Sequence, residues 1–261
     1  MSLAVTPTSV GAMPPASVIV GTPIPIPTFA FQPIVDAEAG TIYSYEALIR
    51  GRGSESAAHV FAQVTADDLD RFDADARTIA IELAASLDLR CHLNLNILPQ
   101  SLQESDAAIR STTDTAARVG LSINRIIIEV TEGQMIADQA RFARVINQFR
   151  GMGLKVAIDD FGAGYSGLNL LADFQPDMVK LDMNLVRGIE GNGPRQAIVR
   201  AIVQVCDDLG IDFLAEGIET LDEYRWFRDQ GVQLFQGYLL AKPAFESLSD
   251  FHDPEAAGRP G

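Results

Sequence analysis

The sequence predicts an α/β fold in which about eight strands close into a (β/α) barrel. Three observations predict it. The 261 residues suit one barrel of about 250 residues or two small domains. Short apolar runs alternate with longer amphipathic ones, which is typical of a parallel sheet covered by helices. Some eight strands in roughly 210 residues favour a closed barrel over an open sheet.

The first two predicted strands, 29–35 and 41–49, differ from the others because a short turn at residues 38–40 joins them. Such a turn joins antiparallel neighbours only. The remaining elements alternate, and residues 67–87 show apolar side chains at helical spacing. They are a helix over 67–87, a strand over 92–97, a helix over 104–119, a strand over 125–130, a helix over 137–151, a strand over 154–159, a helix over 166–172, a strand over 177–181, a helix over 195–209, a strand over 212–216, a helix over 221–229 and a strand over 232–236.

Two helix starts carry capping signals that support this register. Thr220 with Glu223 predicts a capping box in front of the helix at 221, and Thr131 with Gln134 predicts another. We therefore interpret Glu223 as a capping residue and not as part of the chemistry.

The chain ends lack the pattern of the middle. Residues 1–27 are rich in Pro, Ser, Thr and Ala, and we interpret them as a disordered or linker tail. Residues 249–261 are predicted to form a C-terminal tail, which leaves 28–248 as the folded domain. No apolar run reaches the ~18 residues of a membrane span, and no basic region precedes an apolar signal core. We expect a cytoplasmic protein.

Composition limits the ligands. The formal net charge of -15 argues against binding to polymeric nucleic acid, because Lys and Arg must neutralise phosphates. The two cysteines are too few for a disulfide framework, and the three histidines lack ligand-like spacing. Any metal is therefore expected to have oxygen ligands, and a metal between carboxylates and phosphate would let this acidic protein bind a phosphate ester.

Polar or charged residues recur at the carboxyl ends of successive predicted strands. In a barrel these ends meet at one rim, where active sites lie. Crowded carboxylates repel each other unless they take up protons or bind cations, and an all-oxygen set favours Mg²⁺ or Mn²⁺ over zinc. Each residue alone has an ordinary structural explanation, but their repetition favours a metal site. The residues are Glu46, Asn96, Glu129, Asp159 with Asp160, Lys180 with Asp182, Glu216 and Gln236.

Residues 162–167 match the glycine pattern G-x-G-x-x-G, follow a strand and precede a helix, as a dinucleotide-binding turn would. However, Asp160 and Phe161 stand between the strand and the first glycine, and the pattern occurs in the middle of the chain. We expect these glycines to form a mobile loop at the barrel mouth.

Six motifs occur in the order of the EAL-domain family, and the chain resembles that family over residues 28–248. The stretches 128–133 and 158–177 resemble EAL domains attached to blue-light-sensing domains. The motifs are Gln32-Pro33-Ile34, Glu46-Ala47-Leu48-Ile49-Arg50, Asp159-Asp160-Phe161-Gly162-Ala163-Gly164, Lys180-Leu181-Asp182, Ala215-Glu216-Gly217-Ile218-Glu219 and Gln236-Gly237-Tyr238.

The resemblance implies a modified TIM (β/α)8 barrel whose first strand is antiparallel to the rest. It also implies hydrolysis of cyclic di-GMP to linear 5′-pGpG by a water activated between two divalent cations, Mg²⁺ or Mn²⁺. Two rival functions are a catalytically silent cyclic di-GMP receptor and a different metal-dependent barrel hydrolase. A homodimer, and a sensor or cyclase domain in a longer parent protein, are further expectations from the family.

The resemblance also assigns roles to residues. It places Glu46, Asn96, Glu129 and Asp159 on the first metal, and Asp159, Asp160 and Glu216 on the second, with Asn94 as a rival to Asn96. Lys180 would orient the nucleophile and Glu216 would accept its proton, so that Glu216, Lys180 and Asp160 form the catalytic set. Gln32, Arg50, Asp182 and Gln236 are assigned to the substrate, Glu132 to anchoring the 161–167 loop, and Glu219 to a supporting position.

Overall fold

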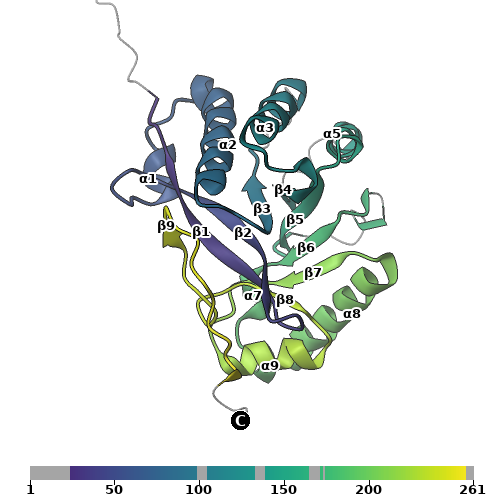
Figure 1. Cartoon of the computed structure of the whole chain (residues 1–261). Coiled ribbons are helices and arrows are strands. Elements are labelled where there is room, and N and C mark those ends of the chain that lie inside the picture. Colours follow the sequence, from purple (N-terminus) through teal and green to yellow (C-terminus); the bar gives the residue numbers. More distant parts are fainter. Residues whose placement is uncertain (1–23, 99–104, 133–138, 165–170, 173, 257–261) are drawn as a thin grey trace, which may run out of the picture.

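The computed structural model describes residues 24–98, 105–132, 139–164, 171–172 and 174–256 (Figure 1). Eight strands close into a barrel, because each strand pairs with the next and β1 pairs with both β2 and β8. The predicted fold class is therefore confirmed. The strands are β1 (Thr28–Asp36), β2 (Thr41–Arg50), β3 (His92–Asn96), β4 (Ile126–Thr131), β5 (Lys155–Phe161), β6 (Met178–Leu181), β7 (Asp212–Ala215) and β8 (Leu234–Phe235).

The first strand runs opposite to the others, as the short turn predicted. β1 is antiparallel to β2 and to β8, whereas β2 to β8 are mutually parallel. The register places Gln32 of β1 opposite Glu46 of β2. The reversed strand therefore still contributes a polar side chain beside the predicted rim.

The longer helices of the described residues lie outside the barrel (Figure 1). They are α2 (Leu69–Ser86), α3 (Ser105–Val119), α5 (Gln139–Gly151), α8 (Gly193–Leu209) and α9 (Leu221–Asp229). The capping box of Thr220 and Glu223 is confirmed at the start of α9. The second predicted box includes Gln134, which lies outside the described residues, as does most of the helix expected over 166–172.

Short elements escaped the sequence analysis because they contain too few residues to show a period. They are α1 (Ala57–Phe61), α7 (Met183–Val186), the 3-10 turns Ala66–Asp68, Ile123–Arg125 and Ile189–Gly191, and β9 (Ala244–Phe245), which pairs with β1.

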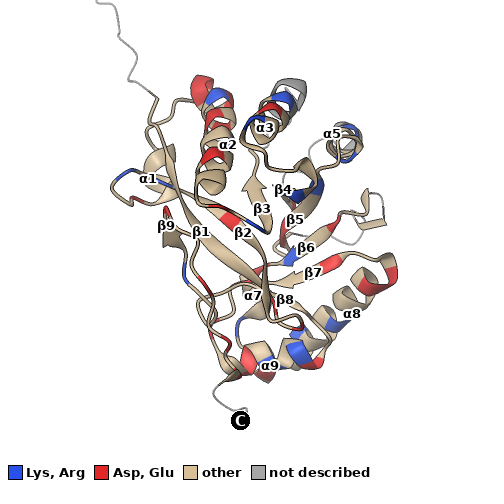
Figure 2. Ribbon diagram, in the orientation of Figure 1, with Lys and Arg blue, Asp and Glu red and all other residues tan. Residues whose placement is uncertain are grey.

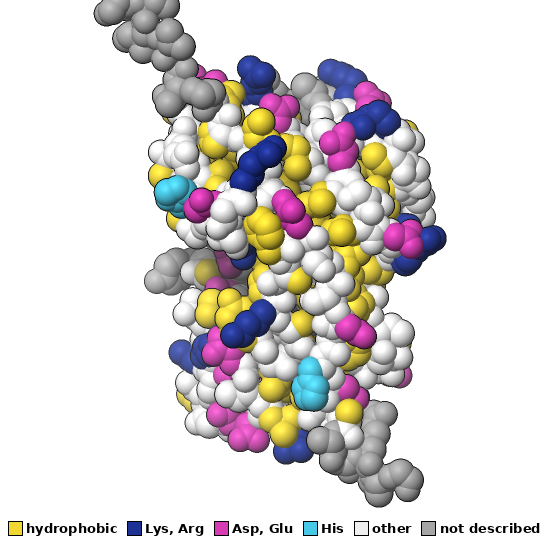
Figure 3. Space-filling model, turned by 60° about the vertical axis from the view of Figure 1, so that its left-hand side comes forward, with side chains coloured by type: hydrophobic (Ala, Val, Ile, Leu, Met, Phe, Trp, Pro, Cys, Tyr) yellow, Lys and Arg dark blue, Asp and Glu magenta, His cyan; other side chains and the backbone are white. Residues whose placement is uncertain are grey.

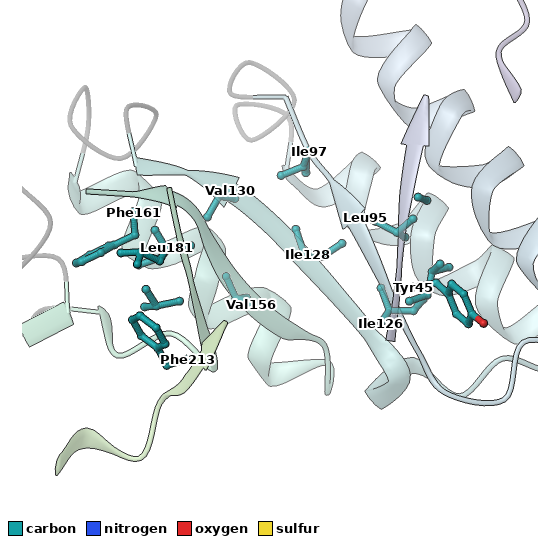
Figure 4. Close-up of a cluster of buried hydrophobic side chains, with 14 of the residues drawn as sticks. Tyr45, Leu95, Ile97, Ile126, Ile128, Val130, Val156, Phe161, Leu181 and Phe213 are labelled. Atoms are coloured by element: carbon teal, nitrogen blue, oxygen red, sulfur yellow. The ribbon is translucent and has the colours of Figure 1, made fainter. Parts of the chain in front are cut away.

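The main hydrophobic core lies between the barrel and its helices. Figure 4 shows side chains from several strands in this layer, among them Ile126, Ile128 and Val130 of β4. The alternate residue Ile127 belongs to a second, smaller cluster with members from other strands, such as Met178 and Leu214. Because side chains alternate between the two faces of a strand, this second cluster fills the barrel interior.

The apolar residues of the inner face show in which direction the polar side chains at the strand ends point. Glu129 is two positions beyond Ile127 and therefore points to the same inner face, about 6–7 Å further along the strand. The same two-residue spacing relates four other pairs, one on each of four strands. The pairs are Ala157 and Asp159, Met178 and Lys180, Leu214 and Glu216, and Leu234 and Gln236.

Residues after β9, including the start of the segment interpreted as a C-terminal tail, contact distant parts of the chain. Tyr45 donates its hydroxyl to the carbonyl of Ser249 at 2.7 Å, and the backbone N–H of His252 donates to the carbonyl of Leu240 at 2.8 Å. Phe251 packs against the main core. The face that carries β9, turned forward in Figure 3, shows hydrophobic side chains gathered along its middle.

Among the described residues, no helix is both long and apolar enough to cross a membrane.

Candidate active site

A cleft with a volume of about 280 Å³ opens at the carboxyl ends of the strands. Figure 2 shows acidic positions on β2 and β5 and a basic position on β6, and the ends of these strands supply charged side chains to this cleft, as does the end of β7 with Glu216. Most of the residues predicted from strand ends line it. The lining residues are Gln32, Glu46, Asp159, Asp160, Lys180, Met183, Arg187, Glu216, Gly217, Glu219, Gln236, Gly237 and Tyr238.

Lys180 lies at the centre of the charged groups and is only 1% exposed. Its Nζ is 2.8 Å from Glu129 Oε1, 2.8 Å from Glu216 Oε1, 3.1 Å from Asp159 Oδ1 and 3.7 Å from Glu46 Oε2. One ammonium therefore faces four carboxylates in a buried site. The negative charge exceeds what this cation can balance.

Burial and mutual repulsion shift the proton affinities of the acids. Burial raises the pKa of Glu216 to about 8; Lys180 opposes this rise and Asp159 adds to it. Burial also raises the pKa of Glu129 well above its usual range, with Lys180 again opposing. Both shifts favour the protonated form of these acids in the metal-free protein, which would relieve part of the repulsion.

The pKa values of Lys180, Glu46 and Asp160 also shift in directions that this arrangement of charges explains. Burial would lower the pKa of Lys180, but the surrounding carboxylates raise it well above its usual value, so the ammonium stays charged. Burial would raise the pKa of Glu46, but Lys180 and the amides of Gln236 and Asn96 lower it. Burial raises the pKa of Asp160, and the carboxylate of Asp159 raises it further.

Three acids at this rim offer oxygen atoms close enough for one cation. Ligand atoms of Asp159, Asp160 and Glu216 all lie within 4.8 Å of one another. Asp160 has a φ of +54°, which a non-glycine residue adopts at some energetic cost and which is common at functional sites. This backbone turn lets both neighbouring aspartates contribute to the rim.

The donor set fits divalent cations of the hard, oxygen-binding kind. Glu129 Oε2 and Asn94 Oδ1 are buried, and neither has a hydrogen-bond partner among the described residues. Buried polar atoms normally have partners, and Glu129 Oε2 is therefore available to coordinate a cation. Oxygen donors from carboxylates and an amide suit Mg²⁺ or Mn²⁺.

Asn94 and Asn96 both point to the inner face of β3, since they are two residues apart, but they differ in depth. Asn94 is fully buried and donates to Glu129 Oε1 at 2.8 Å. Asn96 lies at the strand end and donates to Glu46 Oε1 at 3.2 Å. The inward direction of the side chain is therefore common to both residues and does not decide between them. Their depth differs, and Asn96 is the one at the rim.

Two predicted residues have contacts outside the cluster of acids. Arg50 donates to the carbonyl of Ile49 at 2.8 Å and is not among the residues that line the cleft. Asp182 caps α7 by accepting the backbone N–H of Asn184 at 3.0 Å. Neither contact brings the side chain into the cleft.

Glu132 and Glu219 lie beside loops of the site. Glu132 is buried and accepts the backbone N–H groups of Gly162 at 3.0 Å and Gly164 at 3.1 Å. It therefore holds the described start of the glycine loop. Glu219 forms an ion pair with Arg187 at the cleft wall.

Sequence analysis gave no role to five residues that line the cleft: Met183, Arg187, Gly217, Gly237 and Tyr238. Met183 belongs to α7 and Arg187 follows it, and this four-residue helix has no period to detect. Tyr238 was part of a quoted motif without an assigned role. The neighbouring Gly237 is required for space, because a Cβ there would lie 2.1 Å from the carbonyl oxygen of Ile218.

The fold and the site define a class of protein: a (β/α) barrel with an acidic, all-oxygen site around a buried lysine. A family model for the EAL domain matches residues 28–243. The chain therefore belongs to the EAL-domain family, and the resemblance that the sequence motifs indicated is confirmed.

Relatives of known name share most of the chain. It is 33% identical over 228 residues to the blue light- and temperature-regulated antirepressor BluF of Escherichia coli K12, covering 87% of this chain and 57% of that protein. It is 29% identical over 230 residues to the cyclic di-GMP phosphodiesterase PA2567 of Pseudomonas aeruginosa, covering 85% and 39%. The chain thus spans about half the length, or less, of these curated relatives.

Two solved structures are similar in fold. A standalone EAL protein from Vibrio cholerae O395, in a c-di-GMP bound form, aligns with a TM-score of 0.82 and 43% identity, covering 87% of this chain and 95% of that one. The manganese and cyclic di-GMP complex of Klebsiella pneumoniae BlrP1 aligns with a TM-score of 0.84 and 41% identity, covering 88% and 59%.

Proposed function

We propose that this chain is a metal-dependent phosphodiesterase that hydrolyses cyclic di-GMP to linear 5′-pGpG. The observation that carries the proposal is the buried Lys180 within reach of four carboxylates at the barrel rim. Metal-assisted hydrolysis needs such an excess of oxygen ligands beside a group that can orient a nucleophile. Two relatives support the proposal: PA2567 is named a cyclic di-GMP phosphodiesterase, and the similar BlrP1 structure is a complex with manganese and cyclic di-GMP.

We assign two cation sites to this rim. Glu46, Asn96, Glu129 and Asp159 hold the first cation, and Asp159, Asp160 and Glu216 hold the second. When bound, two such cations polarise a phosphodiester and lower the pKa of a water between them. The short separation of the ligand atoms of Asp159, Asp160 and Glu216 supports the second site.

The chain's own residues then supply binding and proton transfer. Lys180 orients the nucleophile, because its ammonium lies between acids of β2, β4, β5 and β7 and has little freedom to move. Glu216 accepts a proton from the attacking water, a role that its position in the cleft supports, with its Oε1 2.8 Å from Lys180 Nζ. Gln32 and Gln236 line the cleft and contact the substrate.

The remaining assignments concern substrate contacts and support. We keep Arg50 as a phosphate contact, although in this structure its guanidinium is on the carbonyl of Ile49. We also keep Asp182 as a substrate contact, although in this structure its carboxylate caps α7. Glu132 anchors the glycine loop.

A second candidate function is a cyclic di-GMP receptor that binds without cleaving. One observation favours it: BluF, a relative that this chain covers along 57% of its length, is named an antirepressor. The retained acids and lysine favour the enzyme. For the whole protein, the phosphodiesterase proposal also includes the use of Mg²⁺ or Mn²⁺ and a cytoplasmic location. It further includes a homodimer and an attached sensor or cyclase domain.

The test is incubation of the purified protein with cyclic di-GMP and either Mg²⁺ or Mn²⁺, with products separated by chromatography. We expect pGpG from the wild type, and at least a hundredfold less from Glu46→Ala, Asp159→Ala or Glu216→Ala with the fold intact. Binding without product supports the receptor. Near-normal rates in all three variants contradict the assigned site.

A further inference from the structure

Glu223 makes more contacts than a capping box needs. Within the box, its backbone N–H donates to Thr220 Oγ1 at 3.2 Å, and its Oε2 accepts the N–H of Thr220 at 3.1 Å. Oε2 also accepts the N–H of Glu219 at 3.0 Å. The other oxygen, Oε1, accepts the N–H of Gly188 at 3.1 Å, and Gly188 belongs to the loop after α7. The carboxylate therefore joins two loops that follow different strands.

Arg187 strengthens the same junction. Its Nη1 lies 3.5 Å from Glu223 Oε2, and its Nη2 pairs with Glu219. Glu223 is only 3% exposed, whereas Arg187 lines the cleft. Burial would raise the pKa of Glu223, but the backbone N–H groups that it accepts lower it, so the group is anionic at neutral pH.

The loop after β7 carries Glu216, and its two sides are held in different ways. On the β8 side the backbone N–H of Ile218 donates to the carbonyl of Gln236 at 3.0 Å, and the N–H of Leu239 donates to the carbonyl of Ile218 at 3.0 Å. On the β6 side Gly217 packs so closely that a Cβ would lie 3.0 Å from Met183 Cβ. Across this β6 side Glu223 accepts the N–H of Gly188, and Arg187 pairs with both Glu219 and Glu223.

We propose that Glu223 is a positioning residue of the active site. Its carboxylate holds the 216–220 loop against residues 187–188 and thereby sets where Glu216 lies relative to Lys180. The consequence for metal binding rests on the proposed function. Partners that orient a metal ligand change metal affinity about 10- to 100-fold when they are removed.

The test compares two substitutions in the same capping box. Glu223→Gln keeps a side chain that completes the box, since Gln serves there as Glu does. It loses the charge that pairs with Arg187 and leaves one oxygen where there were two. Thr220→Ala removes the other half of the box, and among the described residues the Thr220 hydroxyl bonds to the Glu223 N–H and not to residues 187–188.

Two measurements decide the outcome. In metal-free protein we expect Glu223→Gln to speed hydrogen exchange at the Gly188 amide at least tenfold, whereas Thr220→Ala lowers the melting temperature without this change. By calorimetry we expect Glu223→Gln to weaken Mn²⁺ binding about tenfold, with Thr220→Ala near the wild type. Arg187→Met leaves the box intact and should weaken Mn²⁺ binding severalfold.

The proposal is overturned if Glu223→Gln leaves both the exchange and the Mn²⁺ affinity unchanged. Equal changes in Glu223→Gln and Thr220→Ala also overturn it, because they mean that capping alone is responsible. If the wild type binds no Mn²⁺, the proposed function fails. Exchange at Gly188 and over 216–219 then still shows whether Glu223 holds the two loops together.

Discussion

Replacing Lys180 by Met tests whether this buried ammonium is the counter-charge of the metal-free site. The side chain is 1% exposed, so solvent screens its four ion pairs very little. Breaking a buried pair by removing one partner costs about 3–5 kcal/mol. For a chain of this size, that loss lowers the melting temperature by roughly 6–20 °C.

The loss of stability in Lys180→Met should grow as the pH rises. Without the ammonium, Glu129 and Glu216 hold their protons to still higher pH, and the folded state binds more protons than the unfolded state. Stability then falls as pH rises above the unfolded carboxyl pKa of about 4.5. The deficit of the variant is therefore larger at pH 8 than at pH 6.

Thermal unfolding in EDTA and in excess Mn²⁺ measures both effects. Mn²⁺ supplies the missing positive charge, so we expect it to raise the melting temperature of the variant more than that of the wild type. Lys155→Met is the matched control, because Lys155 contacts the Tyr43 hydroxyl at 3.2 Å at the opposite end of β5 from the site. A melting temperature in EDTA at pH 8 within 2 °C of the wild type would refute the reasoning.

Binding of Mn²⁺ at pH 7 should release protons, because burial raises the pKa of Glu216 to about 8 and a metal binds the ionised form. Calorimetry in buffers of different ionisation enthalpy measures the release, and identical heats would contradict it. Gly237→Ala should cost about 3 kcal/mol or more, because the new Cβ meets the Ile218 carbonyl at 2.1 Å. Urea unfolding checks this, with Gly193→Ala, whose Cβ meets nothing within 4 Å, as the control. Glu132→Ala should lower turnover about tenfold or more, because a charge-assisted hydrogen bond contributes about 1.5–3 kcal/mol to the loop. A normal rate in that variant would show that the loop needs no anchor.

Much of the barrel followed from local pattern in the sequence. The alternation of short apolar runs with longer amphipathic ones predicted every strand of the closed barrel within a few residues, because buried parallel strands are apolar and the helices that cover them are amphipathic. The short turn at 38–40 predicted the antiparallel first strand. The box at Thr220 and Glu223 marked a helix start correctly.

Placement at the carboxyl ends of the predicted strands indicated which polar residues share the rim. Glu129, Asp159, Lys180 and Glu216 follow apolar residues of the inner face by two positions, so a closed barrel must bring them together. The sequence alone thus determined the fold class, the family and the membership of the acidic cluster.

Only the tertiary structure decided how these groups meet. That Lys180 contacts four acids, that Asn96 is at the rim while Asn94 is buried, and that Arg187 enters the cleft all depend on depth and on loop paths. Elements such as α7 and β9 are too short to show a period, and residues 249–256 are held by contacts with distant parts of the chain. Local periodicity specifies the direction of a side chain, whereas closure of the barrel and packing of its loops set the distances between residues far apart in sequence.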